Sequence, residues 1–488
     1  MQKYEHAFGK NDIRGIYGDD ITEELFYNTG RGFVEWLKEK SGLSTEKMYI
    51  TVARDARLHS PSLENALANG ILSTGAHVIS LGLAPTPIGY YSEVVGVPGY
   101  EIISSAIITA SHNPKEYNGL KMTFQHHTLN EAQIKEVKEL TFKNWIQYNN
   151  SEPSDNSGII NYNIIPDYIS DMENRFGKIG KGVKVVVDSA NATGGIVGPE
   201  LYKKLGCEVI ELYSEPDGNF PNHHPNPSVE KTLDKLKEVV VENNADIGIA
   251  YDGDSDRIGI IDSFGRFLTG DKLLLIYAID LIENCKPKGI LPTVVSEVKC
   301  SQVLFDEINR LGGKSVMCKT GHGYIKDKMK ETGALLAGEM SGHTFFKDRY
   351  YGFDDAIYAG CRIIEIISKQ KKLNLSFKIS DMLKAFDAVY SSSEVRYPCP
   401  NELKKSTLEN IKNHISRNKD IFGSKIKDII TLDGMRIVFD GGFALIRQSN
   451  TEPVFTLRFE AKTKDECDRF KAVMTNLLDE ILKSPVQM

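Results

Sequence analysis

Three carboxylates at alternate positions are the strongest chemical signal in this chain. Asp252, Asp254 and Asp256 lie in the motif DGDSDR. Residues at i, i+2 and i+4 of an extended or looped chain point the same way, so these side chains can converge on one hard cation. The apolar runs 246–251 and 257–262 on either side are typical of buried strands. Because buried carboxylates in a tight connection are costly without a counter-ion, the pattern favours a metal site over a solvated loop.

A serine in a turn-forming segment is the second signal. Ser111 lies in the motif TASHNP, where we expect it to be exposed and able to carry a covalently bound group. An isolated motif of this kind is more often only a turn. The adjacent His112 either orients groups and stabilises charge or has a purely structural role. Lys121 follows an Asn118-Gly119 turn that could fold it back. With a pKa lowered by burial it would act as a general base, and otherwise it is a solvated lysine.

A guanidinium beside short hydroxyl and amide side chains is the third signal. Arg447, Ser449, Asn450 and Thr451 lie in the motif RQSNTEP. A forked guanidinium and several hydroxyls match the oxygens of a phosphate. Arg257, directly after the aspartates, either holds phosphoryl oxygens or makes a surface salt bridge. Together the three signals predict phosphoryl chemistry in which a serine, a metal and a phosphate clamp cooperate.

With these motifs in hand, the chain resembles the α-D-phosphohexomutases, specifically the bacterial phosphomannomutase/phosphoglucomutase branch. Five segments carry the resemblance over nearly the whole length. They are similar, in order, to the family's active-site arginine motif, phosphoserine loop, magnesium loop, sugar-specificity loop and phosphate-binding loop, and they lie at 12–15, 109–121, 252–257, 338–343 and 447–453. The resemblance implies an enzyme that interconverts hexose 1-phosphate and 6-phosphate, of mannose and/or glucose. The route would run through a phosphoserine and a hexose 1,6-bisphosphate.

The resemblance also implies roles for individual residues. The implied catalytic residues are Ser111, Lys121, Arg14, Arg257 and His112. The implied ligands of Mg²⁺, an ion that suits hard oxygen donors, are Ser111 through its phosphate, Asp252, Asp254 and Asp256. The implied substrate-binding residues are Lys299, His322, Glu339, Ser341, His343, Arg447, Ser449, Asn450 and Thr451. Of these, Glu339 and Ser341 would contact the sugar 3- and 4-hydroxyls. Glucose 1,6-bisphosphate, or mannose 1,6-bisphosphate, would be the activator, and hexose phosphates the partners of a monomer or homodimer.

Some positions depart from the mannose/glucose pattern. Asn11 stands where the bacterial phosphomannomutases often have an aromatic residue, and Phe8-Gly9 is similar to the phosphoglucosamine branch. Met340 and the segment 345–349 are similar to the mannose/glucose branch. Phosphoglucosamine mutase and a magnesium-dependent sugar phosphatase are therefore alternatives. A sugar-phosphate sensor built on a retired mutase is disfavoured, because the serine, the aspartates and the phosphate-loop arginine are all present.

Bulk composition restricts the class of protein. The chain has 488 residues, which suggests about three or four domains. A net charge of -7 without a dominant basic tract argues against nucleic-acid binding. Residues 1–6 contain no apolar signal core, and the strongest apolar run, 273–279, is too short to span a membrane. Seven cysteines without CxxC spacing indicate reduced thiols and a cytoplasmic location.

The order of expected elements predicts three α/β domains with mixed sheets, followed by an α+β domain. Expected strands lie at 48–52, 77–81, 183–187, 246–251, 257–262, 293–297, 436–439, 443–446 and 454–457, and expected helices at 62–73, 354–367 and 463–483. A polar stretch, 149–158, is expected to be a linker. The expected domains are 1–158 with the phosphoserine loop, 159–264 with the metal loop, 265–378 with the sugar loop and 379–488 with the phosphate loop. The resemblance implies that the four domains surround one central cleft.

Overall fold

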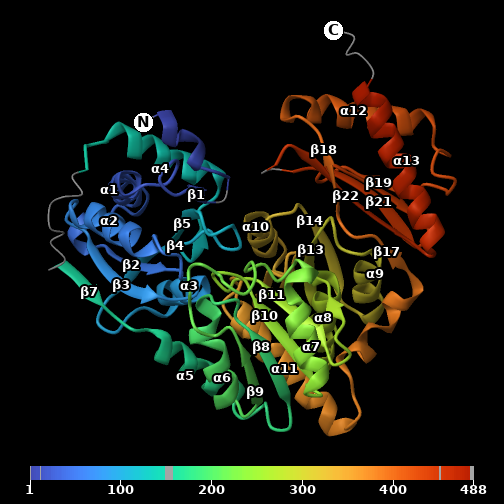
Figure 1. The fold of residues 1–488 in the computed structure, drawn as a ribbon, viewed down its shortest axis with the longest axis horizontal. Coiled ribbons are helices and arrows are strands. Elements are labelled where there is room, and N and C mark those ends of the chain that lie inside the picture. Colours follow the sequence, from blue (N-terminus) through green and yellow to red (C-terminus); the bar gives the residue numbers. More distant parts are fainter. Residues whose placement is uncertain (1, 11, 149–157, 450–451, 484–488) are drawn as a thin grey trace. The chain divides into compact units, whose positions relative to one another are not determined.

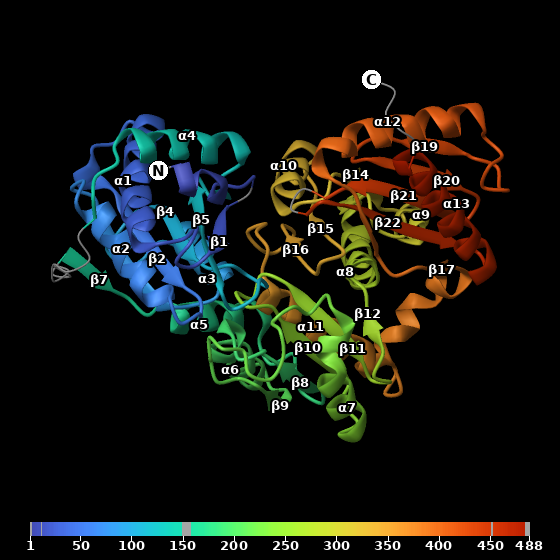
Figure 2. The ribbon, with the colours of Figure 1, turned by 45° about the horizontal axis from the view of Figure 1, so that its top comes forward.

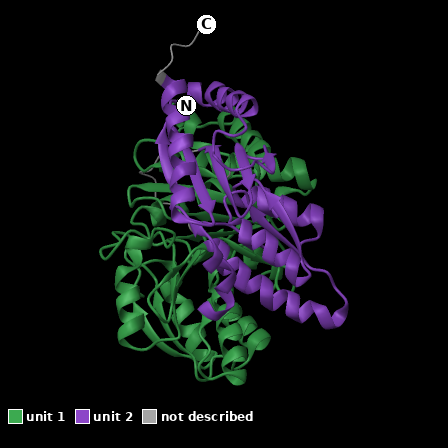
Figure 3. Ribbon diagram, turned by 90° about the vertical axis from the view of Figure 1, so that its right-hand side faces the viewer, with its two compact units in different colours: residues 1–269, 341–379 green, residues 270–340, 380–488 purple. Residues whose placement is uncertain are grey.

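The computed structural model describes residues 2–10, 12–148, 158–449 and 452–483 (Figure 1). The chain divides into two compact units (Figure 3). Unit 1 contains residues 1–269 and 341–379, and unit 2 contains residues 270–340 and 380–488. Within the described ranges, every helix is too short or too polar to serve as a membrane span.

The first sheet of unit 1 has the strand order β1-β5-β4-β2-β3-β7, with β6 paired to β5. Strands β4, β2, β3 and β7 are parallel, whereas β5 is antiparallel to β4 and β1. The strands are β1 (Ile13–Ile16), β2 (Tyr49–Arg54), β3 (His77–Leu83), β4 (Ile102–Ile108), β5 (Tyr117–Phe124), β6 (His127–Thr128) and β7 (Ile159–Asn161). The helices of this domain are α1 (Glu23–Ser41), α2 (Ser60–Leu72), α3 (Thr86–Val95) and α4 (Glu131–Lys143).

Helices pack on both faces of this sheet, as expected for parallel strands that are buried on both sides. On β2, Ile50 and Val52 point into the large core that also contains side chains of α1, α2 and α4. Thr51 points to the opposite face, where its Oγ1 lies 2.8 Å from Ser92 Oγ of α3. The period-2 alternation of a strand therefore divides the helices between the two faces.

The second sheet of unit 1 has the order β12-β11-β10-β8-β9. Strand β8 is parallel to β9 and β10, whereas β10 and β11 form an antiparallel pair. The strands are β8 (Lys184–Asp188), β9 (Glu208–Leu212), β10 (Ile247–Tyr251), β11 (Ile258–Asp262) and β12 (Phe267–Leu268). Unit 1 also contains α5 (Ile165–Phe176), α6 (Gly198–Lys204), α7 (Asp234–Glu242), α11 (Ala356–Leu373) and the short strand β16 (Thr344–Phe346).

Unit 2 begins with parallel strands in the order β14-β13-β15. Its α/β part consists of β13 (Thr293–Glu297), β14 (Lys314–Cys318), β15 (Leu336–Gly338), α8 (Gly270–Cys285), α9 (Gln302–Leu311) and α10 (His322–Thr332). Its antiparallel sheet has the order β17-β22-β21-β20-β19, with β18 also paired to β22. The members are β17 (Tyr390–Ser391), β18 (Val395–Pro398), β19 (Asp428–Ile430), β20 (Met435–Phe439), β21 (Gly442–Gln448) and β22 (Val454–Ala461).

Two helices complete the C-terminal domain: α12 (Asn401–Arg417) and α13 (Lys464–Lys483) lie against this antiparallel sheet (Figure 2). Ala444 and Ile446 of β21 belong to the core shared with these helices. Phe443 and Leu445, which alternate with them, pack instead on Val298 of the α/β part. The antiparallel sheet is thus buried on both faces inside unit 2.

The predicted fold class of three α/β domains and a C-terminal α+β domain is confirmed. Each predicted strand and helix is present, and its ends differ from the predicted ends by a few residues. The Asn118-Gly119 turn is wrong: both residues lie inside β5, where they pair with Gly15 and Arg14 of β1. The predicted linker falls almost wholly outside the described residues. The domain boundaries stay a prediction; β7, just after the first of them, pairs with β3 of the first sheet.

A buried carboxylate links α3 to the turn between β5 and β6. Glu93 is 5% exposed, and its Oε1 accepts a hydrogen bond from His126 N at 2.7 Å. The ring of His126 is the facing ionisable group, with Nδ1 at 3.8 Å from Oε1. Burial raises the pKa of Glu93 to about 7, from an ordinary value of 4.5. At intermediate pH the folded protein therefore holds a proton here that the unfolded chain has released.

Because this proton must be released as pH rises, the free energy of unfolding of the N-terminal domain should fall with pH. Between pH 4.5 and 7 the folded state binds more protons than the unfolded state at Glu93, so the free energy of unfolding should fall by about 2–3 kcal/mol across that window. Glu93→Gln should remove the fall. The two tryptophans, Trp36 and Trp145, both lie in this domain, so their fluorescence in urea titrations from pH 5 to 8 reports it. The exposed control Glu39→Gln should retain the wild-type dependence. An equal pH dependence in both variants would contradict the assignment.

Candidate active site

The aspartate motif forms the connection between β10 and β11. Tyr251 and Ile258 are antiparallel partners, and Ser255 at the tip has a left-handed φ of 61°. Asp252, Asp254 and Asp256 are buried, and their ligand oxygens lie within 4.8 Å of one another. The predicted tight connection between two buried strands is therefore confirmed.

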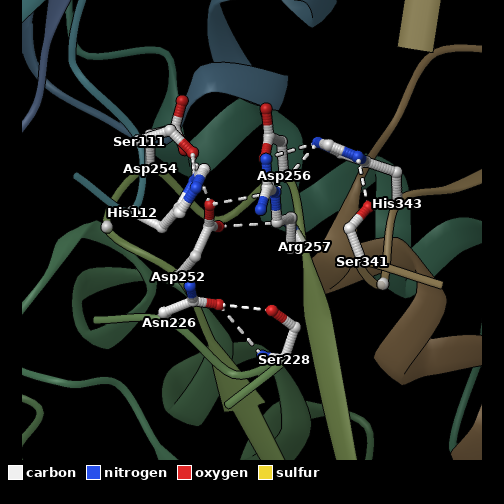
Figure 4. A network of polar contacts seen from close by, with 12 residues as sticks. Ser111, His112, Asn226, Ser228, Asp252, Asp254, Asp256, Arg257, Ser341 and His343 are labelled. Carbon is white, nitrogen blue, oxygen red and sulfur yellow. Dashed lines mark hydrogen bonds and ion pairs between the residues drawn. The ribbon is translucent and has the colours of Figure 1, made fainter. Parts of the chain in front are cut away.

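Ser111 lies in the turn after β4 and contacts the aspartates directly (Figure 4). Its Oγ donates to Asp252 Oδ2 at 2.7 Å and lies 3.1 Å from His112 Nδ1. Its backbone is left-handed, with φ 50°, and its N–H donates to Thr109 Oγ1 at 2.8 Å. The expectation of an exposed serine is wrong, because Ser111 is 2% exposed. Serine, imidazole and carboxylate nevertheless meet in one place.

Lys121 reaches the cluster from β5, so a strand and not a turn carries it. Its Nζ lies 2.6 Å from Asp254 Oδ2 and 2.5 Å from Asp256 Oδ2. Burial opposes the ammonium form, but these two carboxylates together raise the pKa of Lys121 well above its usual value. Neither sequence alternative holds, because the pKa of Lys121 is raised and its side chain is buried. Lys121 is an ammonium that offsets part of the carboxylate charge.

Arg257 and His343 flank the cluster on its other side (Figure 4). Arg257 N donates to Asp252 Oδ1 at 3.1 Å, and its Nε lies 3.9 Å from Asp252 Oδ2. His343 Nε2 lies 3.2 Å from Asp256 Oδ1, and Ser341 Oγ lies 3.1 Å from His343 Nδ1. Despite burial, Lys121 and His343 hold the pKa of Asp256 well below its usual range. Two residues of the predicted sugar loop are thus brought to the metal loop within unit 1.

The remaining predicted catalytic residues add positive charge and a neutral imidazole. Arg14 is ion-paired with Asp12, and its Nη1 donates to Asn113 Oδ1 at 3.0 Å. Burial, together with the charges of Arg257 and Arg14, lowers the pKa of His112 well below its usual value. His112 therefore favours the neutral imidazole form beside the serine hydroxyl.

The other predicted residues lie in unit 2, around a buried carboxylate that the sequence interpretation missed. Glu297, at the end of β13, accepts from Met340 N at 2.7 Å and from Thr320 Oγ1 at 2.5 Å. Lys299 Nζ lies 3.7 Å from Glu297 Oε1. Glu339 Oε1 accepts from Gly321 N at 2.7 Å, and the next residue, His322, begins α10. An acidic residue that ends an apolar strand is the signal that could have identified Glu297.

The phosphate-loop arginine is tied to this group through a second missed carboxylate. Arg447 Nε donates to Asp433 Oδ2 at 3.1 Å, and the same oxygen accepts from Thr320 N at 3.1 Å. Ser449 O accepts from Lys404 Nζ at 3.0 Å. The predicted residues Asn450 and Thr451 lie outside the described residues. Nothing in the sequence connects Asp433 with Thr320, because they are far apart along the chain.

Comparison with protein families covers almost the whole chain. Four family models match in order: phosphoglucomutase/phosphomannomutase alpha/beta/alpha domain I at residues 5–146, domain II at 166–265, domain III at 269–386 and the C-terminal domain at 394–477. The chain belongs to the phosphoglucomutase/phosphomannomutase family. It is therefore an enzyme of the phosphohexomutase type, and the resemblance on the five motifs is confirmed.

Individual members of this family are similar over their full lengths. The chain is 38% identical to a phosphomannomutase/phosphoglucomutase of Pseudomonas aeruginosa over 474 residues, covering 97% of this chain and 96% of that protein. It is 36% identical to a phosphoglucomutase of Neisseria gonorrhoeae, covering 96% of each. A phosphoglucomutase/phosphomannomutase family protein from Burkholderia thailandensis, solved by crystallography, has a TM-score of 0.84 at 32% identity and covers 98% of each chain.

The acidic cluster of this phosphohexomutase can bind a metal ion. All donors are carboxylate oxygens, as hard divalent cations prefer. Asp254 Oδ2 accepts from Thr86 Oγ1 at 2.6 Å and from Lys121, whereas the buried Asp254 Oδ1 has no hydrogen-bond donor among the described residues. Burial, together with the charges of Asp256 and Asp254, raises the pKa of Asp252 well above its usual range. Asp256 Oδ1 likewise has no hydrogen-bond donor among the described residues, so two buried carboxylate oxygens of the cluster are available to a cation.

Divalent cations should accordingly stabilise the folded protein. A cation that binds only the folded state adds about 2.7 kcal/mol at a concentration of 100 times its Kd, so the thermal midpoint should rise with the logarithm of added MgCl₂ or MnCl₂. Asp254→Asn should reduce that rise strongly. Asp262→Asn, at a buried aspartate that accepts from Phe264 N outside the cluster, should retain it. Scanning calorimetry of both variants in EDTA and in a cation series measures the difference. A wild-type thermal midpoint that does not change with any added divalent cation would refute the metal site.

Proposed function

We propose that this protein interconverts the 1-phosphate and 6-phosphate of mannose and glucose, with Ser111 as the phosphoryl carrier. The observation that carries the proposal is the 2.7 Å contact between Ser111 Oγ and Asp252 Oδ2, inside a cluster that also holds Lys121. Buried charges that are not fully paired are costly, so three carboxylates and one ammonium around a serine hydroxyl favour a charged ligand at this place. The relatives named phosphomannomutase/phosphoglucomutase and phosphoglucomutase support the choice of sugars.

The proposed reaction moves a phosphoryl group twice. The bond between phosphorus and Ser111 Oγ breaks as a sugar hydroxyl oxygen bonds to phosphorus, which gives a hexose 1,6-bisphosphate. The bisphosphate then returns its other phosphoryl group to Ser111 Oγ. The sugar hydroxyl loses a proton as the departing Ser111 Oγ gains one, and we assign the transfer of that proton to His112, whose Nδ1 lies 3.1 Å from Ser111 Oγ. Lys121, held as an ammonium by its two carboxylates, serves as a cation in this scheme.

Charge neutralisation is the main catalytic requirement of phosphoryl transfer. Arg14 and Arg257 are the arginines that we assign to the oxygens of the transferring group. We assign Mg²⁺ to Asp252, Asp254 and Asp256, with an oxygen of the serine phosphate, where it would neutralise charge on that group. The oxygen-only donor set favours this ion over zinc.

Substrate recognition is assigned to the sugar and phosphate loops. We propose that Glu339 and Ser341 bind the sugar 3- and 4-hydroxyls, with the 2-hydroxyl left unread, so that mannose and glucose are both accepted. Further contacts are assigned to Lys299, His322 and His343. We assign the non-transferring phosphate to Arg447, Ser449, Asn450 and Thr451. The activator would be glucose 1,6-bisphosphate or mannose 1,6-bisphosphate.

Substrate preference is tested by initial rates on mannose, glucose and glucosamine 1-phosphates, measured in parallel with catalytic glucose 1,6-bisphosphate. We expect both neutral hexoses to be converted to their 6-phosphates within about tenfold of each other, since they differ only in the orientation of the 2-hydroxyl, which the proposed site does not contact. Glucosamine 1-phosphate should be slower. A clear preference for glucosamine 1-phosphate would assign the protein to the phosphoglucosamine branch. Release of inorganic phosphate without the 6-phosphate would instead indicate a phosphatase.

The carrier is tested by intact-mass analysis of freshly purified protein. A fraction should carry one phosphate, mapped to Ser111 by peptide sequencing. Ser111→Ala should lack that species and lose most turnover. Because residue 111 has a φ of 50°, Ser111→Gly is the matched variant that removes the hydroxyl without backbone strain, and it should be equally inactive. Mutase activity near that of the wild type in the glycine variant would exclude a phosphoserine mechanism.

A further inference from the structure

Arg57 is a buried arginine in the loop between β2 and α2. It is 1% exposed and is ion-paired with Asp55, its Nε lying 2.9 Å from Asp55 Oδ2. Asp55 is itself fixed, because its Oδ1 accepts from Ser60 Oγ at 2.6 Å and from Arg57 N at 3.1 Å. One face of the guanidinium lies 5.4 Å from the centre of the Phe220 ring. A charged side chain is thus held in one orientation by its surroundings.

The guanidinium of Arg57 uses all five of its N–H groups. The first is donated to Asp55, and the other four are donated to backbone carbonyls of the serine turn. These acceptors are Ser111 O at 2.9 Å, Asn113 O at 2.7 Å, Pro114 O at 2.5 Å and Tyr117 O at 2.9 Å. No donor is left for a substrate phosphate. Arg57 therefore cannot bind a phosphate through its guanidinium, which is the role that we assign to Arg14 and Arg257.

The carbonyl of Ser111 is confined from a second side as well. A Cβ on Gly253 would lie 2.3 Å from Ser111 O, so the backbone of the aspartate loop passes directly against this oxygen. Arg57 Nη2 holds the same oxygen by a hydrogen bond. Ser111 has a left-handed φ of 50°, a conformation that is uncommon for non-glycine residues. Contacts of its carbonyl with Arg57 and with the backbone at Gly253 stabilise this conformation.

We propose that Arg57 is a positioning residue that holds the Ser111 turn in the backbone conformation from which its hydroxyl transfers phosphoryl groups. The inference rests on the proposed function of Ser111. Four hydrogen bonds from one rigid, planar cation fix the backbone carbonyls of this turn relative to one another. The fixed backbone then directs Ser111 Oγ towards Asp252. A shift of about 1 Å at a reacting atom can lower a rate roughly 100-fold. Loss of the four guanidinium hydrogen bonds should therefore lower turnover more than it weakens substrate binding.

Arg57→Lys is the informative substitution, because lysine keeps a positive charge opposite Asp55 but cannot reach four carbonyls with a planar fork. Arg362→Lys is the matched control. Arg362 is also 1% exposed and ion-paired in unit 1, with Nη1 at 2.8 Å from Asp348 Oδ1, but it lies on α11 away from the turn. Both variants lose a buried guanidinium, so both should lower the thermal midpoint.

Steady-state kinetics on glucose 1-phosphate separates the two roles. We expect Arg57→Lys to lower kcat roughly 100-fold, with KM changed by less than about threefold, and Arg362→Lys to keep kcat within about twofold of the wild type. Phosphorylation of Ser111 by labelled glucose 1,6-bisphosphate should slow in parallel with kcat. A folded Arg57→Lys protein with wild-type kcat, or with a raised KM and unchanged kcat, would overturn the proposal.

A second variant keeps the test decisive if Arg57→Lys does not fold, which tryptophan fluorescence reports. Asp55→Asn keeps an acceptor for Arg57 but weakens the pair, and a kcat lowered roughly tenfold at unchanged KM would support the proposal. A wild-type kcat in Asp55→Asn would then overturn it. Failure of the proposed function is recognised separately, because the wild-type protein would show no conversion of glucose 1-phosphate.

Discussion

The burial of three carboxylates beside one ammonium is the interaction on which the arrangement of unit 1 depends. The tight loop removes three carboxylates from water, those of Asp252, Asp254 and Asp256. The single positive charge of Lys121 cannot balance their negative charge. At separations near 4 Å, unit charges interact by about 4 kcal/mol even when partly screened. Cations must therefore come from elsewhere in the fold. Arg257, directly after the loop, and Arg14, near the serine turn, supply this charge. His343, from a distant segment, places Nε2 3.2 Å from Asp256 Oδ1.

The carboxyl ends of strands supply most of these groups, as is usual in open α/β sheets. The serine turn follows β4, the Arg57 loop follows β2, and the aspartate loop follows β10. Thr86, at the start of α3, donates to Asp254 and so ties the first sheet to the loop of the second. Two separate sheets thus contribute to one cluster. In unit 2 a comparable role belongs to two carboxylates. Glu297 accepts from Met340 N of the predicted sugar loop, and Asp433 accepts from Thr320 N and from Arg447 Nε of the predicted phosphate loop.

Local patterns in the sequence predicted the elements and the convergence of the three aspartates, because both depend on neighbours in the chain. Apolar runs defined β10 and β11, and alternate aspartates defined the carboxylate cluster between them. Lys121 shows where local reasoning stops. Asn-Gly usually indicates a turn, but here long-range pairing with β1 extends a strand through it. Burial alone would lower a lysine pKa, yet its partners lie 133 and 135 positions away and reverse the direction. The role of Arg57 was invisible for the same reason, since its four acceptors are carbonyls in a segment more than 50 positions away.

The confinement of the Ser111 carbonyl between Arg57 and Gly253 has a consequence for the energetics of turnover. The cost of ordering this turn, in conformational entropy and in an unfavourable φ, is met once when the chain folds. In the proposed reaction, a phosphoryl group is gained or lost beyond Cβ while the backbone stays fixed. Little reorganisation is left to add to the barrier of each transfer. The proposed carrier serine is therefore held rigidly, and the accuracy of its position depends on the stability of the surrounding domain.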